Sequence, residues 1–198
     1  DRANLEEMKA LIPFTNRESG RLAIIVCNSG GPPPGKAMDL DPDKWAAAAA
    51  LLITSPVQLL REALPLLRES PAPRFFVVTS SSTKQPVPGL TLSNVYRPGV
   101  HGLIKTLADE LAAERVRTHS IAPGRFDTER LGHVIDMQAK NAGKTHEEIK
   151  EAMKASIPAG RLGEPAEIGN LVAFLASERA DYLTGANWLV DGGLVRSL

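Results

Sequence analysis

Short apolar segments alternate along this chain with longer amphipathic ones, and this alternation is the strongest constraint on its fold. The segments at 22–27, 75–79 and 115–121 have the pattern of strands, and helical patterns follow each of them. Strands separated by helices in this way form parallel βαβ units whose helices cover both faces of the sheet. The sequence therefore predicts an α/β protein with a doubly wound parallel sheet, closed by a last strand at 186–190.

Length and composition fit one domain over residues 1–198. Acidic and basic residues balance at 23 each, so no net charge favours binding to nucleic acid or to an anionic membrane. Small molecules and proteins are the expected partners. Cys27 is the only cysteine, and the sequence shows neither a signal peptide nor an apolar run of membrane length. These features predict a reducing, cytoplasmic location.

Three helical regions follow from the pattern. The helix predicted over 41–69 begins with an aspartate N-cap and a proline at its first position, and Pro56 should interrupt it because proline has no N–H to donate. A second helix is predicted over 93–113, where apolar residues recur on one face. Residues 129–158 form a helical excursion after a strand end. Two interpretations of it stay open: a substrate lid, or a surface helix pair that only packs.

Residues 30–37 match the spacing of a phosphate-binding loop, but their chemistry argues against that function. Such a loop points backbone N–H groups at the anion, and three of its four variable positions here are prolines, which have none. Ala37 also replaces the hydroxyl that binds magnesium. We interpret the segment as a rigid extended loop at the carboxyl end of a strand, where open α/β sheets bind their ligands.

The strand at 75–79 leads into Ser80, and thirteen residues later the next helix opens with the sequence Ser-Asn-Val-Tyr-Arg at 93–97. This segment resembles the catalytic segment of the short-chain dehydrogenase/reductase family, in which a serine precedes a Tyr-x-x-x-Lys pair. Ser80 fits the family serine, Ser93 falls on the tyrosine position and Arg97 on the lysine position.

In that family, serine orients the substrate carbonyl, tyrosine exchanges a proton with the substrate oxygen, and lysine holds the nicotinamide ribose. The resemblance therefore implies that Ser80 orients substrate and that Arg97 holds the ribose, although a guanidinium fork is not equivalent to an ammonium. Ser93 is a much weaker acid than a phenol, so ribose binding without proton transfer is one expected outcome.

Tyr96 lies one residue before Arg97, on a neighbouring face of the same helix. Two interpretations stay open for it. The first is a half-buried packing aromatic. The second is a substitute proton donor, in which case Tyr96→Phe should abolish turnover and leave cofactor binding intact.

Further blocks resemble cofactor-binding segments of the family. The turn with Asn28 and Gly30 resembles the Asn-Asn-Ala-Gly block beside the adenosine of the cofactor, and lies about fifty residues before Ser80 as the family layout requires. After the strand at 115–121 comes a Pro-Gly block, whose members would seat the nicotinamide: Pro123, Gly124 and Thr128.

The family's fourth catalytic position, an asparagine that acts partly through a main-chain carbonyl, falls on Leu52. Pro56 cannot donate to the carbonyl four residues before it. We therefore hypothesise that the freed Leu52 carbonyl keeps a water site.

The segment 160–193 is the most specific match to the family, and its parts are structural there: a helix, the last strand and an oligomer contact. The glycine-rich turn of the family is absent from this sequence, and residues 1–5 resemble those just after the second strand of the family fold. The N-terminal βαβ part is therefore expected to be missing, through truncation or because the sequence skips residues. We favour the second explanation, and the mass of the intact protein would decide.

Taken together, the resemblance implies a Rossmann-like, NAD- or NADP-dependent oxidoreductase that interconverts carbonyls and alcohols, similar to 3-oxoacyl-[acyl-carrier-protein] reductases and to sugar or alcohol dehydrogenases. A homo-oligomer, dimer or tetramer, is implied as well. No histidine or cysteine has a partner at metal-ligand spacing, so no metal site is predicted. The alternative is a binding or assembly protein on the same scaffold that has lost turnover.

Overall fold

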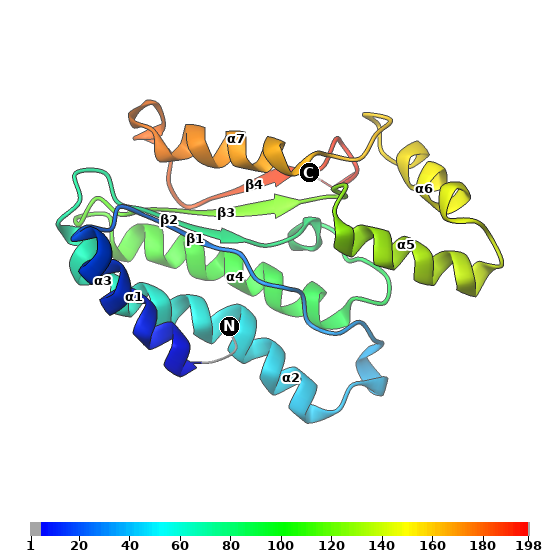
Figure 1. The fold of residues 1–198 in the computed structure, drawn as a ribbon, viewed down its shortest axis with the longest axis horizontal. Helices are drawn as coiled ribbons and strands as arrows, with labels where there is room; N and C mark the ends of the chain where they lie inside the picture. The colour runs from blue at the N-terminus through cyan, green and yellow to red at the C-terminus, as the bar shows by residue number, and fades with distance from the viewer. Residues whose placement is uncertain (1–4, 198) are drawn as a thin grey trace.

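The computed structural model describes residues 5–197, which form one parallel sheet with helices on both of its faces (Figure 1). This confirms the predicted α/β fold class. The four strands lie side by side in chain order: β1 (Ile24–Cys27), β2 (Arg74–Val78), β3 (Arg117–Pro123) and β4 (Ala186–Val190). The expectation made for residues 1–4 lies outside the described residues.

The two faces of the sheet build two apolar clusters. In β2, Phe75 packs with side chains of α3 (Ser55–Arg68) and α4 (Thr91–Glu110) on one face, while Phe76 packs beneath α7 (Pro165–Ala176) on the other. Both rings are fully buried, as expected of successive residues in a strand covered on both sides. Figure 1 shows the same division, with α7 on one side of the strands and α3 and α4 on the opposite side.

Strand β1 ends the sheet on one side and is covered on one face only. Ile25 and Cys27 are buried toward the core, whereas Ile24 and Val26 are each 45% exposed. The remaining helix on this side, α1 (Leu5–Ser19), lies against α3.

The long helix predicted over 41–69 consists of three parts: α2 (Pro42–Ala49), a π-helical turn at Ala50–Thr54, and α3. The break thus lies in the turn just before Pro56. Asp41 occupies the N-cap position, but its carboxylate pairs with Lys44 at 3.1 Å and makes no cap hydrogen bond.

By length and composition, the whole segment Pro42–Arg68 meets the criterion for a membrane-crossing helix, which corrects the prediction that no run of that length exists. Core helices meet the same criterion. Its apolar side chains Leu52, Leu59, Leu60 and Leu67 are buried in the cluster shared with the sheet.

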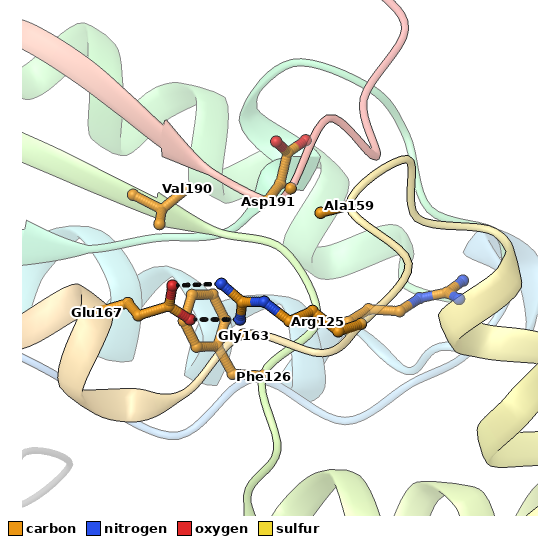
Figure 2. Close-up of a pocket in the computed structure, with 9 residues that line it drawn as sticks. Arg125, Phe126, Ala159, Gly163, Glu167, Val190 and Asp191 are labelled. Carbon is orange, nitrogen blue, oxygen red and sulfur yellow. Dashed lines mark hydrogen bonds and ion pairs between the residues drawn. The ribbon is translucent and has the colours of Figure 1, made fainter.

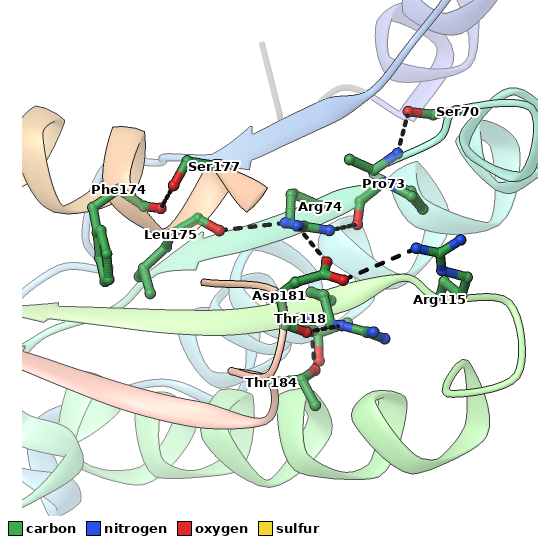
Figure 3. Close-up of polar contacts among 12 residues, drawn as sticks. Ser70, Pro73, Arg74, Arg115, Thr118, Phe174, Leu175, Ser177, Asp181 and Thr184 are labelled. Atoms are coloured by element: carbon green, nitrogen blue, oxygen red, sulfur yellow. Dashed lines mark hydrogen bonds and ion pairs between the residues drawn. The ribbon is translucent and has the colours of Figure 1, made fainter. Parts of the chain in front are cut away.

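A buried cation joins β2 to the segment after α7 (Figure 3). Arg74 is 1% exposed, and its guanidinium donates to Asp181 Oδ1 at 2.9 Å and to the carbonyls of Leu175 and Pro73 at 3.3 and 3.2 Å. Burying a charge is costly unless it is paired and hydrogen-bonded, and Arg74 meets both conditions.

Residues 129–158 contain two helices, α5 (Glu129–Ala142) and α6 (His146–Ala155), which pack on each other past the carboxyl end of the sheet (Figure 1). Thr145 and Glu148 form the predicted capping box at the start of α6. The helical excursion is therefore confirmed, and its role as a lid stays a prediction.

Candidate active site

Ser80 lies two residues after the end of β2 and is the N-cap of a short 3-10 helix, Ser81–Thr83. The Ser80 hydroxyl oxygen accepts the N–H of Ser82 at 3.2 Å, and the Ser80 carbonyl accepts both the N–H and the hydroxyl of Thr83 at 3.0 Å. Because the oxygen of the Ser80 hydroxyl is held as an acceptor, its hydrogen can be donated to a ligand.

Ser93 and Arg97 lie four residues apart on α4 and are both 7% exposed. Arg97 Nη1 donates to the carbonyl of Thr79 at 2.7 Å and to that of Val78 at 3.3 Å. The Ser93 carbonyl lies 3.5 Å from the Ser82 hydroxyl. The structure therefore brings the three residues predicted from the family pattern together at the carboxyl end of β2.

Tyr96 faces away from this group. Its ring packs edge-on against Trp45 of α2, with centroids 6.1 Å apart, and its hydroxyl donates to the Trp45 carbonyl at 3.0 Å. Buried tyrosines usually find such a partner for the hydroxyl. This placement fits the packing interpretation of Tyr96, and within the described helix α4 it leaves no phenol on the face of Ser93 and Arg97.

The turn with Asn28 and Gly30 follows β1 at the same edge of the sheet, and both residues are exposed. The Arg130 side chain, from the first turn of α5, reaches this turn. A Cβ built on Gly31 would lie 2.7 Å from Arg130 Nη2, and one on Gly30 would lie 3.9 Å from Nη1.

The Pro-Gly block lies where β3 leaves the sheet. Pro123 pairs with Val190 of β4, and the N–H of Gly124 donates to the Val190 carbonyl at 2.8 Å. Thr128 caps α5, and its hydroxyl accepts the N–H of Leu131 at 3.3 Å. Asn28, Gly30, Pro123, Gly124 and Thr128 thus all stand at the carboxyl edge, where parallel sheets bind ligands.

The break before Pro56 changes which carbonyl lacks a backbone donor: it is one residue earlier in the chain than predicted. In the π-helical turn, the N–H of Ser55 donates to the Ala50 carbonyl, five residues back. Continuing this pattern, the N–H that Pro56 lacks would face the Leu51 carbonyl rather than that of Leu52. The Ser55 hydroxyl donates to the Leu51 carbonyl at 2.8 Å instead. A water at Leu52 stays a prediction.

A family model described as enoyl-(acyl carrier protein) reductase matches residues 1–195. The chain belongs to the short-chain dehydrogenase/reductase family. The relative 3-oxoacyl-[acyl-carrier-protein] reductase FabG of Vibrio cholerae is 30% identical over 191 residues, which are 96% of this chain and 74% of that protein.

Two solved structures of this family resemble the whole chain. L-sorbose reductase from Gluconobacter frateurii, in complex with NADPH and L-sorbose, has a TM-score of 0.94 at 27% identity, covering 100% of this chain and 76% of that one. An NADPH-bound short chain oxidoreductase from Pseudomonas aeruginosa PAO1 with an atypical catalytic center has a TM-score of 0.89 at 26% identity, covering 100% and 75%.

Next to the Pro-Gly block, this protein has a pocket between the ends of β3 and β4 and the start of α7 (Figure 2). Arg161 and Glu167 form a two-pronged ion pair on its wall, at 2.7 and 2.8 Å. The Arg161 hydrogen bonds, together with the N–H of Glu164, lower the pKa of the Glu167 carboxyl to about 2. Ser80, Ser93 and Arg97 do not line this pocket, so we assign it no part in the chemistry.

The positions of two side chains near the site, Arg130 and His101, escape prediction from the sequence. Arg130 is one of many surface arginines until the fold places α5 beside the turn after β1. His101 lies one helical turn beyond Arg97, and its position at i+4 is the only signal that it shares the face of Ser93 and Arg97.

Proposed function

We propose that this protein is an NAD(P)-dependent oxidoreductase that interconverts carbonyls and alcohols by hydride transfer, with 3-oxoacyl-thioesters as the first substrate class to test. Family membership supports the general reaction. The 30% identity to 3-oxoacyl-[acyl-carrier-protein] reductase supports the substrate class, and the NADPH named for two similar structures supports the cofactor.

The observation that carries the proposal is the position of Arg97. A guanidinium only 7% exposed, hydrogen-bonded to the Val78 and Thr79 carbonyls, stands at the carboxyl end of a central strand beside Ser80. A cation buried at a ligand-binding edge indicates recognition of polar or anionic groups. Arg97 would hold the ribose hydroxyls of the cofactor.

The side chains at this edge fit a dinucleotide. Arg97 and Arg130 supply cationic donors, the turn with Asn28 and Gly30 allows close approach of the adenosine side, and Pro123, Gly124 and Thr128 would seat the nicotinamide. When bound, the cofactor supplies or accepts the hydride. The helices at 129–158 would cover it as a lid.

The protein itself must then orient the carbonyl and handle a proton. Ser80 would donate its hydroxyl hydrogen to the substrate oxygen, because its own oxygen already accepts the Ser82 N–H. Ser93 occupies the family's tyrosine position but cannot approach the acidity of a phenol, so we expect slow turnover with the proton coming through water.

Titration with NADPH and NADH, followed by a screen of 3-oxoacyl thioesters and keto sugars, tests the proposal. Arg97→Met should weaken cofactor binding about tenfold or more, since a charged hydrogen bond is removed. Ser80→Ala should lower turnover and keep cofactor affinity. Lys105→Met, an exposed position on the same helix, is the matched control and should change neither quantity.

One alternative has structural support: a cofactor-binding or assembly protein without turnover. The observation in its favour is that Tyr96 points to Trp45 while a serine fills the tyrosine position. Cofactor binding with no turnover of any carbonyl would select this alternative. Absence of both binding and turnover would contradict the oxidoreductase function and favour a purely structural subunit.

We also propose a cytoplasmic homo-oligomer, dimer or tetramer, as the sequence resemblance implies. Light scattering of the purified protein gives its mass in solution. A mass equal to one chain at micromolar concentration would contradict the oligomer.

A further inference from the structure

A chain of side-chain hydrogen bonds leads from α4 across two strands of the sheet to Ser80. Nδ1 of His101 lies 3.2 Å from the Ser120 hydroxyl, which donates to Asn187 Oδ1 at 2.9 Å. Asn187 Nδ2 donates to the Thr83 hydroxyl at 2.8 Å, and that hydroxyl donates to the Ser80 carbonyl at 3.0 Å. The chain thus links α4, β3, β4 and the turn after β2.

All four bonds run in one direction. A hydroxyl has one hydrogen to donate, and that of Ser120 goes to Asn187, so His101 Nδ1 must be the donor in the bond to Ser120. The His101 ring therefore carries its proton on Nδ1. Hydrogen bonds aligned in this way polarise and strengthen one another.

The charge state of His101 agrees with this assignment. Burial lowers the pKa of the imidazole, and the positive charges of Lys84 and Lys105 lower it further. The ring is therefore neutral at neutral pH, with Nδ1 as its single donor.

The chain of hydrogen bonds connects the two parts of the proposed site, which are Ser93 and Arg97 on α4 and the turn that carries Ser80. His101 follows Ser93 and Arg97 at steps of four residues on α4. The other end fixes the turn that carries Ser80. Ser120 is fully buried and pairs with Asn187 in the sheet register, whereas His101, Asn187 and Thr83 are half-buried, so the chain runs between the sheet and α4.

Apolar side chains could fill this space without the need to satisfy each donor and acceptor. The polar chain therefore does more than pack. Thr83 accepts a hydrogen bond from Asn187 and donates one to the Ser80 carbonyl, so the chain is bonded to the backbone of the residue whose hydroxyl faces the proposed site.

We propose that His101, Ser120, Asn187 and Thr83 are positioning residues that align Ser80 with Ser93 and Arg97 for reaction with the substrate carbonyl. This inference rests on the proposed function for its consequence in catalysis. Its structural part can be measured on the protein without any substrate.

The amide of Ser82 is the reporter, because it donates to the Ser80 hydroxyl. His101→Leu and Thr83→Val each remove one link with little change in size. Both should shift the Ser82 amide resonance in an NMR spectrum and speed its hydrogen exchange by about tenfold. His101→Asn keeps a donor near Nδ1 and should restore the wild-type values.

Thr106→Val is the matched control. Thr106 also carries a hydroxyl on α4, bonded to the Gly102 carbonyl at 3.0 Å, but lies outside the chain. It should leave the Ser82 amide unchanged. In the active enzyme, the two chain-breaking variants should lower kcat about tenfold, with KM and cofactor affinity within about twofold of wild type.

The results separate this inference from the proposed function. A Ser82 amide that responds to Thr83→Val but not to His101→Leu would overturn the inference, as would failure of His101→Asn to restore the signal. If the amide responds as expected and no cofactor binds, the alignment of Ser80 stands and the proposed oxidoreductase function fails. If His101→Leu does not fold, Thr83→Val and Asn187→Leu apply the same test from the other end.

Discussion

Single residues decide how closely two backbone segments can approach each other at the carboxyl edge of the sheet. A Cβ on Gly124 would lie 2.6 Å from the Cβ of Asp191 and 2.8 Å from its Cα. Side chains do not tolerate such distances when the neighbour is backbone. Gly124 is thus required where the ends of β3 and β4 meet, whatever it contributes to cofactor binding.

Gly124→Ala should therefore lower the free energy of unfolding by about 1–3 kcal/mol, because the Asp191 backbone must move. Gly132→Ala on α5 is the control. A Cβ there meets nothing within 4 Å, and the change should stabilise the helix by up to about 1 kcal/mol. Urea denaturation measures both. Equal effects of the two substitutions would contradict the close-packing argument.

At this scale, the resemblance to the family's catalytic segment predicted part of the site. The steps from Ser80 to Ser93 and Arg97 correspond to a strand end and a helix face, and both are local properties. The partners of a side chain are not local. The bond of Tyr96 to Trp45 and the approach of Arg130 to Gly31 depend on how distant elements pack, so spacing left two interpretations for the first and gave no signal for the second.

Among the elements, the π-helical turn before α3 shows how a proline can be accommodated. The Ser55 hydroxyl takes the place of the missing N–H by donating to the Leu51 carbonyl at 2.8 Å. Pro56 itself is buried at the start of α3. The sequence predicted a break at this proline, but the register of the turn decides which carbonyl is affected.

Ser55→Ala should cost about 1–2 kcal/mol of stability, since a carbonyl loses its replacement donor. In a Pro56→Ala background the same substitution should cost less, because the introduced alanine supplies an N–H. A double-mutant cycle by urea denaturation gives this coupling. Thr106→Ala, which removes a similar hydroxyl bond at an exposed position of α4, should change stability by no more than about 0.5 kcal/mol. If the effects of Ser55→Ala and Pro56→Ala on the free energy of unfolding are additive, the Ser55 hydroxyl does not replace the N–H that Pro56 lacks.

The link between β2 and the segment after α7 depends on one ion pair. Asp181→Ala leaves the buried Arg74 guanidinium without its carboxylate, and should cost roughly 2–4 kcal/mol, less than for a fully buried pair because Asp181 is half exposed. Arg115 also pairs with Asp181, at 3.9 Å, but is 67% exposed. Arg115→Ala should therefore cost under about 1 kcal/mol. Thermal unfolding of both variants provides the comparison, and similar losses would show that burial of Arg74 is unimportant.

For the whole molecule, the order of elements was readable from the sequence because alternating strands and helices leave few ways to build a parallel sheet. The contents of the core were less predictable. His119 of β3 is fully buried between Phe76 and Trp188, stacked on the first ring at 5.5 Å and accepting the indole N–H of the second at 3.1 Å. In a strand pattern, a histidine gives no indication that it faces the core.

This buried histidine makes the stability of the molecule depend on pH. Burial, and then the positive charge of Arg74, lower the pKa of His119 from 6.5 to about 4, while the Leu183 backbone acts in the opposite direction to a smaller extent. Between these values the unfolded chain binds a proton that the folded protein excludes. Stability is therefore fully present above about pH 6.5 and falls as the pH decreases toward 4.

The loss attributable to His119 should reach about 3 kcal/mol at the acid end of that range. His119→Asn keeps an acceptor for Trp188 and should remove most of this slope, even if the variant is less stable at every pH. His133→Asn, at an exposed position on α5, should keep it. Urea denaturation at a series of pH values from 4 to 8 measures the slopes. If the His119 variant loses stability with acid as steeply as the wild type, other groups titrate in this range and the buried imidazole does not control the pH response.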